Sequence, residues 1–212
     1  MTDEKRAEEW REYYARTGDR PPRETLLFAL ERFEAEGRQG FAVDLGCGGA
    51  RDTVELLRRG WSVLAVDAQA SAIEQLLSRP DLARHGDRLQ GLVSRFEAAH
   101  WPAADLVNSG FALPLCPKPE FLAMWARIRQ SLTPGGRFSG HLYGDRDEWA
   151  GDPTNAHFSL AEMHDLLADY EVEHFREEEE DSTTPRGKTK HWHIFHIVAR
   201  KPGVDEEARE LR

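Results

Sequence analysis

The chain has 212 residues, of which 40% are hydrophobic and 31% charged, and 38 acidic against 28 basic side chains give a formal net charge of −10. This length predicts one domain with a full core and a terminal extension. An acidic chain without a lysine or arginine cluster repels nucleic acid and anionic membranes, so a small-molecule partner is expected.

Cysteine use and hydropathy narrow the class further. No apolar run approaches the roughly 18 residues that cross a bilayer, and no apolar segment follows Met1-Thr2-Asp3-Glu4-Lys5-Arg6, so a cytoplasmic location without membrane contact is expected. The two cysteines, Cys47 and Cys116, make neither a disulfide framework nor a zinc-ligand pair. We therefore expect no bound metal. The protein is expected to be a monomer or a homodimer.

The amino-terminal part predicts two helices. Residues 3–15 form a charged helix that gathers Trp10, Tyr13 and Tyr14 on one face and ends at Gly18. A second helix opens at Pro21-Pro22 and ends at Gly37. The aromatic face either packs the first helix onto the core or makes residues 1–37 a lid over a site, and a lid also packs. A main domain over 38–202 and a charged tail over 203–212 are then expected.

The central stretch predicts a strand, a tight loop and a helix. The apolar run Phe41-Ala42-Val43 ends in Asp44, the glycine-rich turn Gly46-Cys47-Gly48-Gly49 follows, and a helical pattern starts at Thr53. Open α/β sheets bind ligands at the carboxyl ends of their strands, and glycines let a ligand approach the backbone. The loop is therefore a candidate site for a nucleoside cofactor.

The next segment completes a β-α-β unit with parallel strands. Residues 61–66 form a buried strand that ends in Asp67, and a helix covers 71–77. Asp67 falls 23 residues after Asp44 in the sequence, close to the spacing at which an acid accepts hydrogen bonds from two ribose hydroxyls. An acid at a strand end can also cap a helix, but position and spacing together favour ribose binding.

The remaining elements predict an α/β fold, a doubly wound Rossmann-like sheet of seven strands. Strands and helices alternate, and then two strands follow each other with only a polar loop between them, which makes them an antiparallel C-terminal hairpin on a mostly parallel sheet. The expected strands cover 89–93, 105–108, 137–143, 171–175 and 191–199, with helices over 120–132 and 159–168 and turns at 134–136 and 185–187.

The loop argues against a dinucleotide. A dinucleotide fingerprint needs a third glycine where its helix packs close to a pyrophosphate, and Arg51 stands there. Asp44, two residues before the first glycine, would also repel a pyrophosphate. Neither objection applies to a cofactor that carries an ammonium group and no phosphate.

These residues resemble the class I S-adenosylmethionine-dependent methyltransferases over roughly residues 40 to 200. The first family motif is matched by Val43, Asp44, Gly46 and Gly48, with Ala50 replacing the last glycine. Asp67 matches the ribose-binding acid, and the residues at 134–136 match a Pro-Gly-Gly before the fifth strand. Within the family, the chain looks most like the small-molecule branch that includes tellurite-resistance and thiol methyltransferases.

The resemblance implies S-adenosyl-L-methionine as the cofactor and assigns its contacts. The loop lies under the methionine part, an acid holds the ribose, the third strand frames the adenine, and the fourth strand ends beside the sulfonium and the acceptor. The cofactor-binding residues implied are Asp44, Gly46, Cys47, Gly48, Gly49, Asp67, Ala68, Ser94, Arg95, Phe96, Asn108 and Ser109.

Methyl transfer from an activated donor chiefly needs alignment, which supplies roughly 7 to 11 kcal/mol. A general base is needed only if the acceptor must lose a proton, and Tyr143, His141 and Tyr14 are the candidates. The three histidines at 191, 193 and 196 do not predict a metal site, because the third points to the other face of its strand. The acidic run 177–181 is expected to be a solvated strand end that can pair with Lys188 and Lys190.

Three alternatives remain for the function. One is an S-adenosylmethionine-binding protein with other chemistry or a regulatory role, and another is a nicotinamide-dependent oxidoreductase, which Arg51 disfavours. The third is nucleic-acid methylation. The net charge disfavours it, as does the run Asn108-Ser109-Gly110-Phe111, which stands where an Asn-Pro-Pro-aromatic motif is expected for amino groups of bases.

Overall fold

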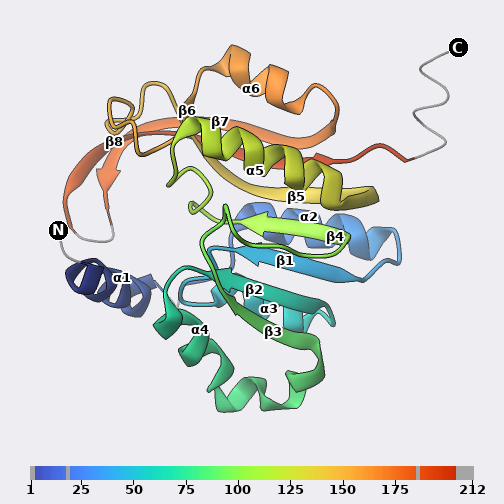
Figure 1. Ribbon diagram of the computed structural model, residues 1–212. Helices are drawn as coiled ribbons and strands as arrows, with labels where there is room; N and C mark the ends of the chain where they lie inside the picture. Colours follow the sequence, from blue (N-terminus) through green and yellow to red (C-terminus); the bar gives the residue numbers. More distant parts are fainter. Residues whose placement is uncertain (1–2, 18–19, 185–186, 204–212) are drawn as a thin grey trace, which may run out of the picture.

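The computed structural model describes residues 3–17, 20–184 and 187–203 (Figure 1). The predicted helix end at Gly18, the turn at Pro185-Arg186 and the tail from 204 to 212 lie outside these residues.

One sheet runs through the molecule in the order β3-β2-β1-β4-β5-β8-β7, and the short β6 pairs with β5 (Figure 1). Strands β3, β2, β1, β4 and β5 are parallel, whereas β8 is antiparallel to both β5 and β7. The predicted fold class is confirmed, with β6 as an unexpected addition. The strands are β1 (Phe41–Leu45), β2 (Ser62–Asp67), β3 (Leu89–Val93), β4 (Ala104–Ser109), β5 (Leu132–Gly144), β6 (His157–Phe158), β7 (Glu171–Thr183) and β8 (Thr189–Arg200).

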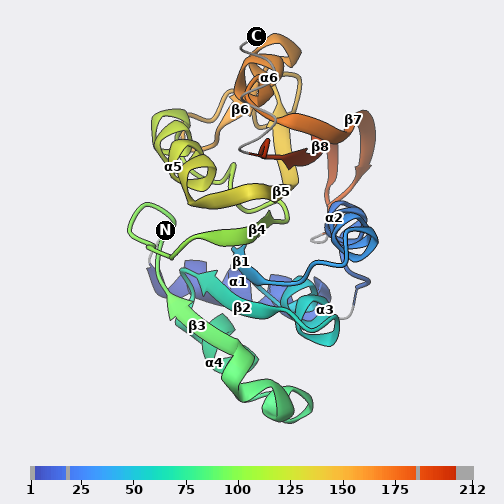
Figure 2. The same cartoon turned by 90° about the vertical axis from the view of Figure 1, so that its right-hand side faces the viewer.

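Helices cover both faces of the sheet. Figure 2 shows α5 on one side and α2 with α3 on the other. Strand β1 is buried on both sides, since Ala42 packs in the cluster of α2 and α3 while Val43 and Leu45 pack in the cluster of α5 and α6. The helices are α1 (Asp3–Thr17), α2 (Glu24–Ala35), α3 (Arg51–Arg58), α4 (Ala70–Leu77), α5 (Lys118–Ser131) and α6 (Leu160–Leu167), with a 3₁₀ helix over Pro80–Arg88.

The chain order creates the crevice in which open sheets bind ligands. Strand β1 has β2 on one side and β4 on the other, so the chain leaves the centre of the sheet in opposite directions. Helix α1 lies at the carboxyl ends of the parallel strands, beyond the arrowheads of β1, β2 and β4 (Figure 1). It therefore lies at the edge of the sheet where the crevice opens.

The expected amino-terminal lid is divided in two by the structure. Helix α2 buries Leu26, Leu30 and Phe33, each 0–1% exposed, against the sheet. Their burial removes enough apolar surface from water to stabilise α2 as part of the core. Helix α2 therefore belongs to the core, whereas α1 lies at the carboxyl ends of the strands.

A buried arginine ties α2 to the far half of the sheet. Arg137 on β5 is 1% exposed, and its guanidinium lies 4.4 Å from the ring centre of Phe33. Its Nε donates to Glu173 of β7 at 2.6 Å, and it also pairs with Glu36 just after α2. Because one guanidinium donates to two carboxylates, it links β5, β7 and the end of α2, which are distant in sequence.

Strand β5 starts five residues earlier than predicted. It begins at Leu132 and includes the predicted turn Pro134-Gly135-Gly136, where its pairing with β4 shifts register between Ala104 and Leu106. Gly135 has φ +74°. The turn is therefore present as an irregularity inside the strand.

Candidate cofactor and acceptor site

The glycine loop is held by the strands on which it stands. Gly46 and Cys47 donate to Val66 O of β2 at 2.8 and 3.1 Å. Gly46 has φ +76°, and a Cβ there would lie 2.2 Å from Ala112 Cβ, so this position requires glycine. Ala50, which replaces the last glycine of the family motif, keeps the left-handed conformation with φ +66°. Ala50 thus adopts a backbone conformation that glycine adopts readily.

Asp67 at the end of β2 faces this loop. Its carboxylate is 4% exposed and accepts hydrogen bonds from Gly48 N at 3.0 Å and Gln69 N at 2.8 Å. Burial raises the pKa of Asp67, and these hydrogen bonds oppose the rise. The carboxylate is therefore positioned by backbone groups next to the loop.

Tyr14 of α1 also reaches Asp67. Its hydroxyl donates to both carboxylate oxygens at 3.3 Å. A Cβ on Gly48 would lie 2.8 Å from Tyr14 Cε1, which places the phenol ring directly on the loop. Burial, and then the Asp67 charge, raise the pKa of Tyr14 above its usual value. The phenol therefore stays protonated and acts as a donor.

Asp44 belongs to a buried polar network at the ends of β1 and β4. It accepts from Thr53 Oγ1 at 2.6 Å and from Asn108 Nδ2 at 2.9 Å. The same amide nitrogen lies 3.3 Å from Asp52, and Ser139 Oγ donates to the amide oxygen at 2.7 Å. Burial, and next the Asp52 carboxylate, raise the pKa of Asp44. No cation of the described residues pairs with Asp44, so the network suits a positively charged ligand.

The other predicted cofactor contacts divide between the loop and the solvent. Phe96 reaches the loop, since its Cζ would lie 3.4 Å from a Cβ on Gly46. Ser94 is half-buried, whereas Ala68 is exposed and Arg95, with 70% of its side chain exposed, pairs with Glu97. Two of the predicted cofactor-binding residues face the protein interior: Ser109 Oγ donates to Leu45 O at 3.1 Å, and Cys47 is a buried free thiol.

Two predicted catalytic candidates lie on the other side of β4, around Phe111. His141 stacks on Phe111 with ring centres 4.2 Å apart, and Arg23 covers Phe111 at 4.3 Å. Phe111 has φ +61°, a strained conformation for an aromatic residue. Burial lowers the pKa of His141 and raises that of Tyr143, so both rings are neutral. A neutral imidazole can accept a proton, whereas a buried phenol cannot.

The wall behind Tyr143 is built around a buried lysine. Lys190 Nζ lies 2.6 Å from both oxygens of Asp147 and 3.5 Å from the ring centre of Trp192, with Trp149 at 4.0 Å. Lys190 therefore does not pair with the acidic run of β7, contrary to the expectation. An ammonium among aromatic faces joins β8 to the loop after β5.

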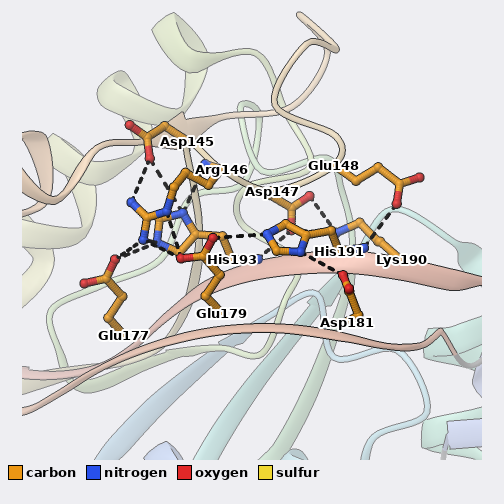
Figure 3. Close-up of polar contacts among 10 residues, drawn as sticks. All are labelled: Asp145, Arg146, Asp147, Glu148, Glu177, Glu179, Asp181, Lys190, His191 and His193. Carbon is orange, nitrogen blue, oxygen red and sulfur yellow. Dashed lines mark hydrogen bonds and ion pairs between the residues drawn. The ribbon is translucent and has the colours of Figure 1, made fainter.

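The acidic residues of β7 pair with a different partner (Figure 3). Arg146 donates to Glu177 at 2.6 Å and to Glu179 at 2.8 Å. His193 contacts Glu177 at 2.8 Å and His191 contacts Glu179 at 3.2 Å, so each imidazole faces a carboxylate. Among the described residues, no group of three or more His, Cys, Asp or Glu side chains is arranged to hold a metal ion.

Sequence reasoning missed several residues of the site. Arg51 was considered only because it replaces a glycine of the dinucleotide motif, and Arg23 and Asp52 were assigned no role. Arg23 N donates to Asp52 at 3.0 Å, and Arg51 Nε lies 3.6 Å from the same carboxylate. Only Asp52 could have been noticed in the sequence, because an acidic side chain in the first turn of a helix interacts favourably with the helix dipole.

Sequence comparisons identify a methyltransferase domain. Residues 42–136 match the family described as the methyltransferase domain. Ribosomal RNA small subunit methyltransferase C of Alcanivorax borkumensis is 44% identical over 68 residues, which are 32% of this chain and 19% of that relative. The chain therefore matches only a small part of this curated relative.

Solved structures show the same fold. TehB from Haemophilus influenzae superposes with a TM-score of 0.69 at 17% identity, over 82% of this chain and 61% of that one. The 1,6-didemethyltoxoflavin-N1-methyltransferase of Burkholderia thailandensis gives 0.61 at 22% identity, over 84% and 79%. Magnesium protoporphyrin IX methyltransferase of Synechocystis PCC 6803 gives 0.60 at 17%, over 84% and 78%.

The fold, the glycine loop and the matched domain define the class. Residues 42–136, less than half of the chain, match a methyltransferase domain, and the sheet order and the solved structures show the fold of the class I S-adenosylmethionine-dependent methyltransferases that the sequence resembles. No helix within the described residues is long and apolar enough to cross a membrane.

Proposed function

We propose that this protein transfers a methyl group from S-adenosyl-L-methionine to a small-molecule acceptor. The observation that carries the proposal is the glycine loop between two buried carboxylates, Asp44 and Asp67, which are 2% and 4% exposed. Asp44 lacks a partner cation among the described residues, and Asp67 accepts from Gly48 N of the loop and from the hydroxyl of Tyr14. A ligand that combines an ammonium group with a ribose satisfies both.

The residues present fit this cofactor. Asp44 would hold the ammonium group, since burial of an unpaired carboxylate favours a bound cation. Asp67 would accept the ribose hydroxyls, and Phe96 would contact the adenine. When bound, S-adenosylmethionine supplies a methyl group on a positively charged sulfur, and its transfer to an acceptor lone pair leaves a neutral thioether. The protein has to orient the acceptor and exclude water.

His141 is the better of the two proton acceptors near Phe111. Its imidazole is neutral, is 1% exposed, and has a buried Nδ1 without a hydrogen-bond partner. The methyl acceptor can hydrogen-bond to this nitrogen, and because burial lowers the pKa of the imidazole, His141 would take up a proton only from an acidic acceptor. Tyr143, with its raised pKa, would instead form the aromatic wall.

Helix α1 is proposed as the lid of the domain formed by residues 38–202. Tyr14 contacts Gly48 and donates to Asp67, which is where the ribose would bind. The phenol therefore has to leave Asp67 before a ribose can bind there. We infer that α1 moves when the cofactor binds.

RNA is the second candidate acceptor, because the curated relative acts on ribosomal RNA by its name. A net charge of −10 counts against a polyanionic partner. We infer a small-molecule acceptor, no nucleic-acid or membrane partner, and a monomer or homodimer. A cytoplasmic location is supported by two buried free cysteines, which suit a reducing compartment.

Calorimetry tests the cofactor, and a labelled-methyl assay tests the transfer. S-adenosylmethionine and S-adenosylhomocysteine should bind and NADH should not; the reverse result would contradict the proposal. The assay takes thiols, phenols, amines, carboxylates, halides, metalloid oxyanions and ribosomal RNA as acceptors. Tight cofactor binding without transfer to any of them would favour a regulatory role, and transfer to RNA alone would favour the second candidate.

A further inference from the structure

A small cavity opens beside the candidate acceptor site. Its volume is about 270 Å³, and it lies between the segment before α2, the start of α3, and strands β5 and β8. This size suits a small organic or inorganic molecule. The side chains that matter here are Arg20, Arg23, Glu24, Arg51, His141 and His196.

The cavity is cationic, although the chain is acidic overall. Three guanidinium groups line it, against the single carboxylate of Glu24. That carboxylate pairs with Arg176 outside the cavity lining and lies 3.1 Å from His196 Nδ1, and these contacts hold the pKa of Glu24 below its usual value. Arg176 also pairs with Glu178, so the charge of Glu24 is only partly offset. The three guanidinium groups of the lining outnumber this carboxylate, and an excess of positive charge remains.

Three nitrogens of the lining are buried without a hydrogen-bond partner: Arg23 Nε, His141 Nδ1 and His196 Nε2, and the last lies 3.3 Å from a Glu178 carboxylate oxygen. A buried donor left unpaired costs about 1–3 kcal/mol, so a ligand with acceptor oxygens is favoured beside Arg23 Nε. The guanidinium of Arg23 and the imidazole of His141 both lie against the ring of Phe111, at 4.3 and 4.2 Å from its centre. Their spacing is thereby set by a rigid ring.

The cavity is connected to the cofactor side by one carboxylate. Asp52 accepts from Arg23 N at 3.0 Å and lies 3.3 Å from Asn108 Nδ2, whose other contact is Asp44. Asp52 also lies 3.6 Å from Arg51 Nε, so it offsets the charge of Arg51 and leaves Arg20 and Arg23 to carry the positive charge of the lining. The arginines are thus fixed to the end of β4, where the acceptor would meet the methyl group.

We propose that this cavity binds an anionic group of the methyl acceptor, so that the substrate is a small carboxylate or oxyanion. The inference rests on the proposed methyl transfer for its biological meaning, but the anion site exists independently of it. Arg23 is the central contact, because its guanidinium is held on Phe111 and its Nε lacks any other partner. Arg20, which is exposed at the rim, adds charge.

Calorimetry with matched anionic and neutral probes tests the site without turnover. Acetate, benzoate, phosphate and selenite are titrated into the whole protein, with acetamide and benzamide as neutral controls. At least one anion should bind ten times more tightly than the neutral compounds. Arg23→Gln should weaken anion binding about tenfold and Arg20→Gln about threefold.

Arg129→Gln is the matched control variant. Arg129 lies on α5, has half of its side chain exposed, and pairs with Asp169 away from the cavity. This variant should bind anions as the wild type does. Anions that bind no better than the amides, or that lose as much affinity in Arg129→Gln as in Arg23→Gln, would overturn the proposal. Arg20→Gln keeps the test decisive if Arg23→Gln fails to fold.

Binding of S-adenosylhomocysteine is measured on the same samples to separate the two proposals. Its affinity should change less than twofold in Arg23→Gln and Arg20→Gln. Cofactor binding without anion binding would leave the proposed methyl transfer standing and refute the anion site. Anion binding without cofactor binding would refute the methyl transfer and leave the anion site standing.

Discussion

Removing the hydroxyl of Tyr14 should strengthen cofactor binding. In the free protein this hydroxyl donates to both oxygens of Asp67 at 3.3 Å, in the place proposed for the ribose. Tyr14→Phe keeps the ring that packs on Gly48 and removes only the donor. The ribose then no longer competes with the phenol for the carboxylate.

The size of the effect follows from the hydrogen bond that is lost. A hydrogen bond to a charged group contributes about 1.5–3 kcal/mol, but one shared between two oxygens at 3.3 Å is long, so about 1 kcal/mol is reasonable. Since about 1.4 kcal/mol corresponds to a factor of ten, the Kd for S-adenosylhomocysteine should fall about fivefold. The free protein should lose a similar amount of unfolding free energy.

Calorimetry measures the effect, and two variants control it. Tyr13→Phe changes the neighbouring phenol, which stacks edge-on against Tyr14 at 6.1 Å, and should leave the Kd unchanged. In an Asp67→Asn background, Tyr14→Phe should have a much smaller effect, since the acceptor carries no charge. Weaker binding by Tyr14→Phe would show that the phenol holds the bound cofactor, and an unchanged Kd would show that the ribose is held elsewhere.

Three further predictions concern the carboxylates and the buried arginine. Asp67→Ala should weaken cofactor binding while circular dichroism shows the fold intact, and an unchanged affinity would place the ribose elsewhere. Burial and Asp52 raise the pKa of Asp44, so the folded chain binds more protons than the unfolded chain above the usual aspartate pKa of about 4. Unfolding free energy should therefore fall as pH rises from about 4 to the raised pKa, whereas affinity for S-adenosylhomocysteine should rise between pH 5 and 7. Asp44→Asn should flatten both pH profiles and weaken S-adenosylhomocysteine binding about thirtyfold. A wild-type protein whose stability and affinity do not depend on pH would contradict this prediction. Arg137→Met should lower the unfolding free energy by about 3 kcal/mol in urea titrations, because it leaves Glu173 without its partner, and a loss below about 1 kcal/mol would mean that solvent replaces the arginine.

The sequence alone determined the features that depend on short stretches of chain. Apolar runs that end in Asp44 and Asp67, with glycines after the first, predict two parallel strands and a ligand loop, because strand burial and turn formation involve neighbouring residues. The missing helix between the last two strands predicts their antiparallel pairing for the same local reason. Even Ala50 keeps the left-handed backbone of the motif.

Only the tertiary structure decided which distant side chains meet. Arg23, Phe111 and His141 come from three separate segments, and their stacking depends on how α2, β4 and β5 pack. Lys190 pairs with Asp147, which is 43 positions away, instead of with the nearby acidic run. No periodicity records such contacts, since each depends on the relative placement of whole elements. The methyl donor could therefore be inferred from the loop, while the charge of the acceptor pocket required the fold.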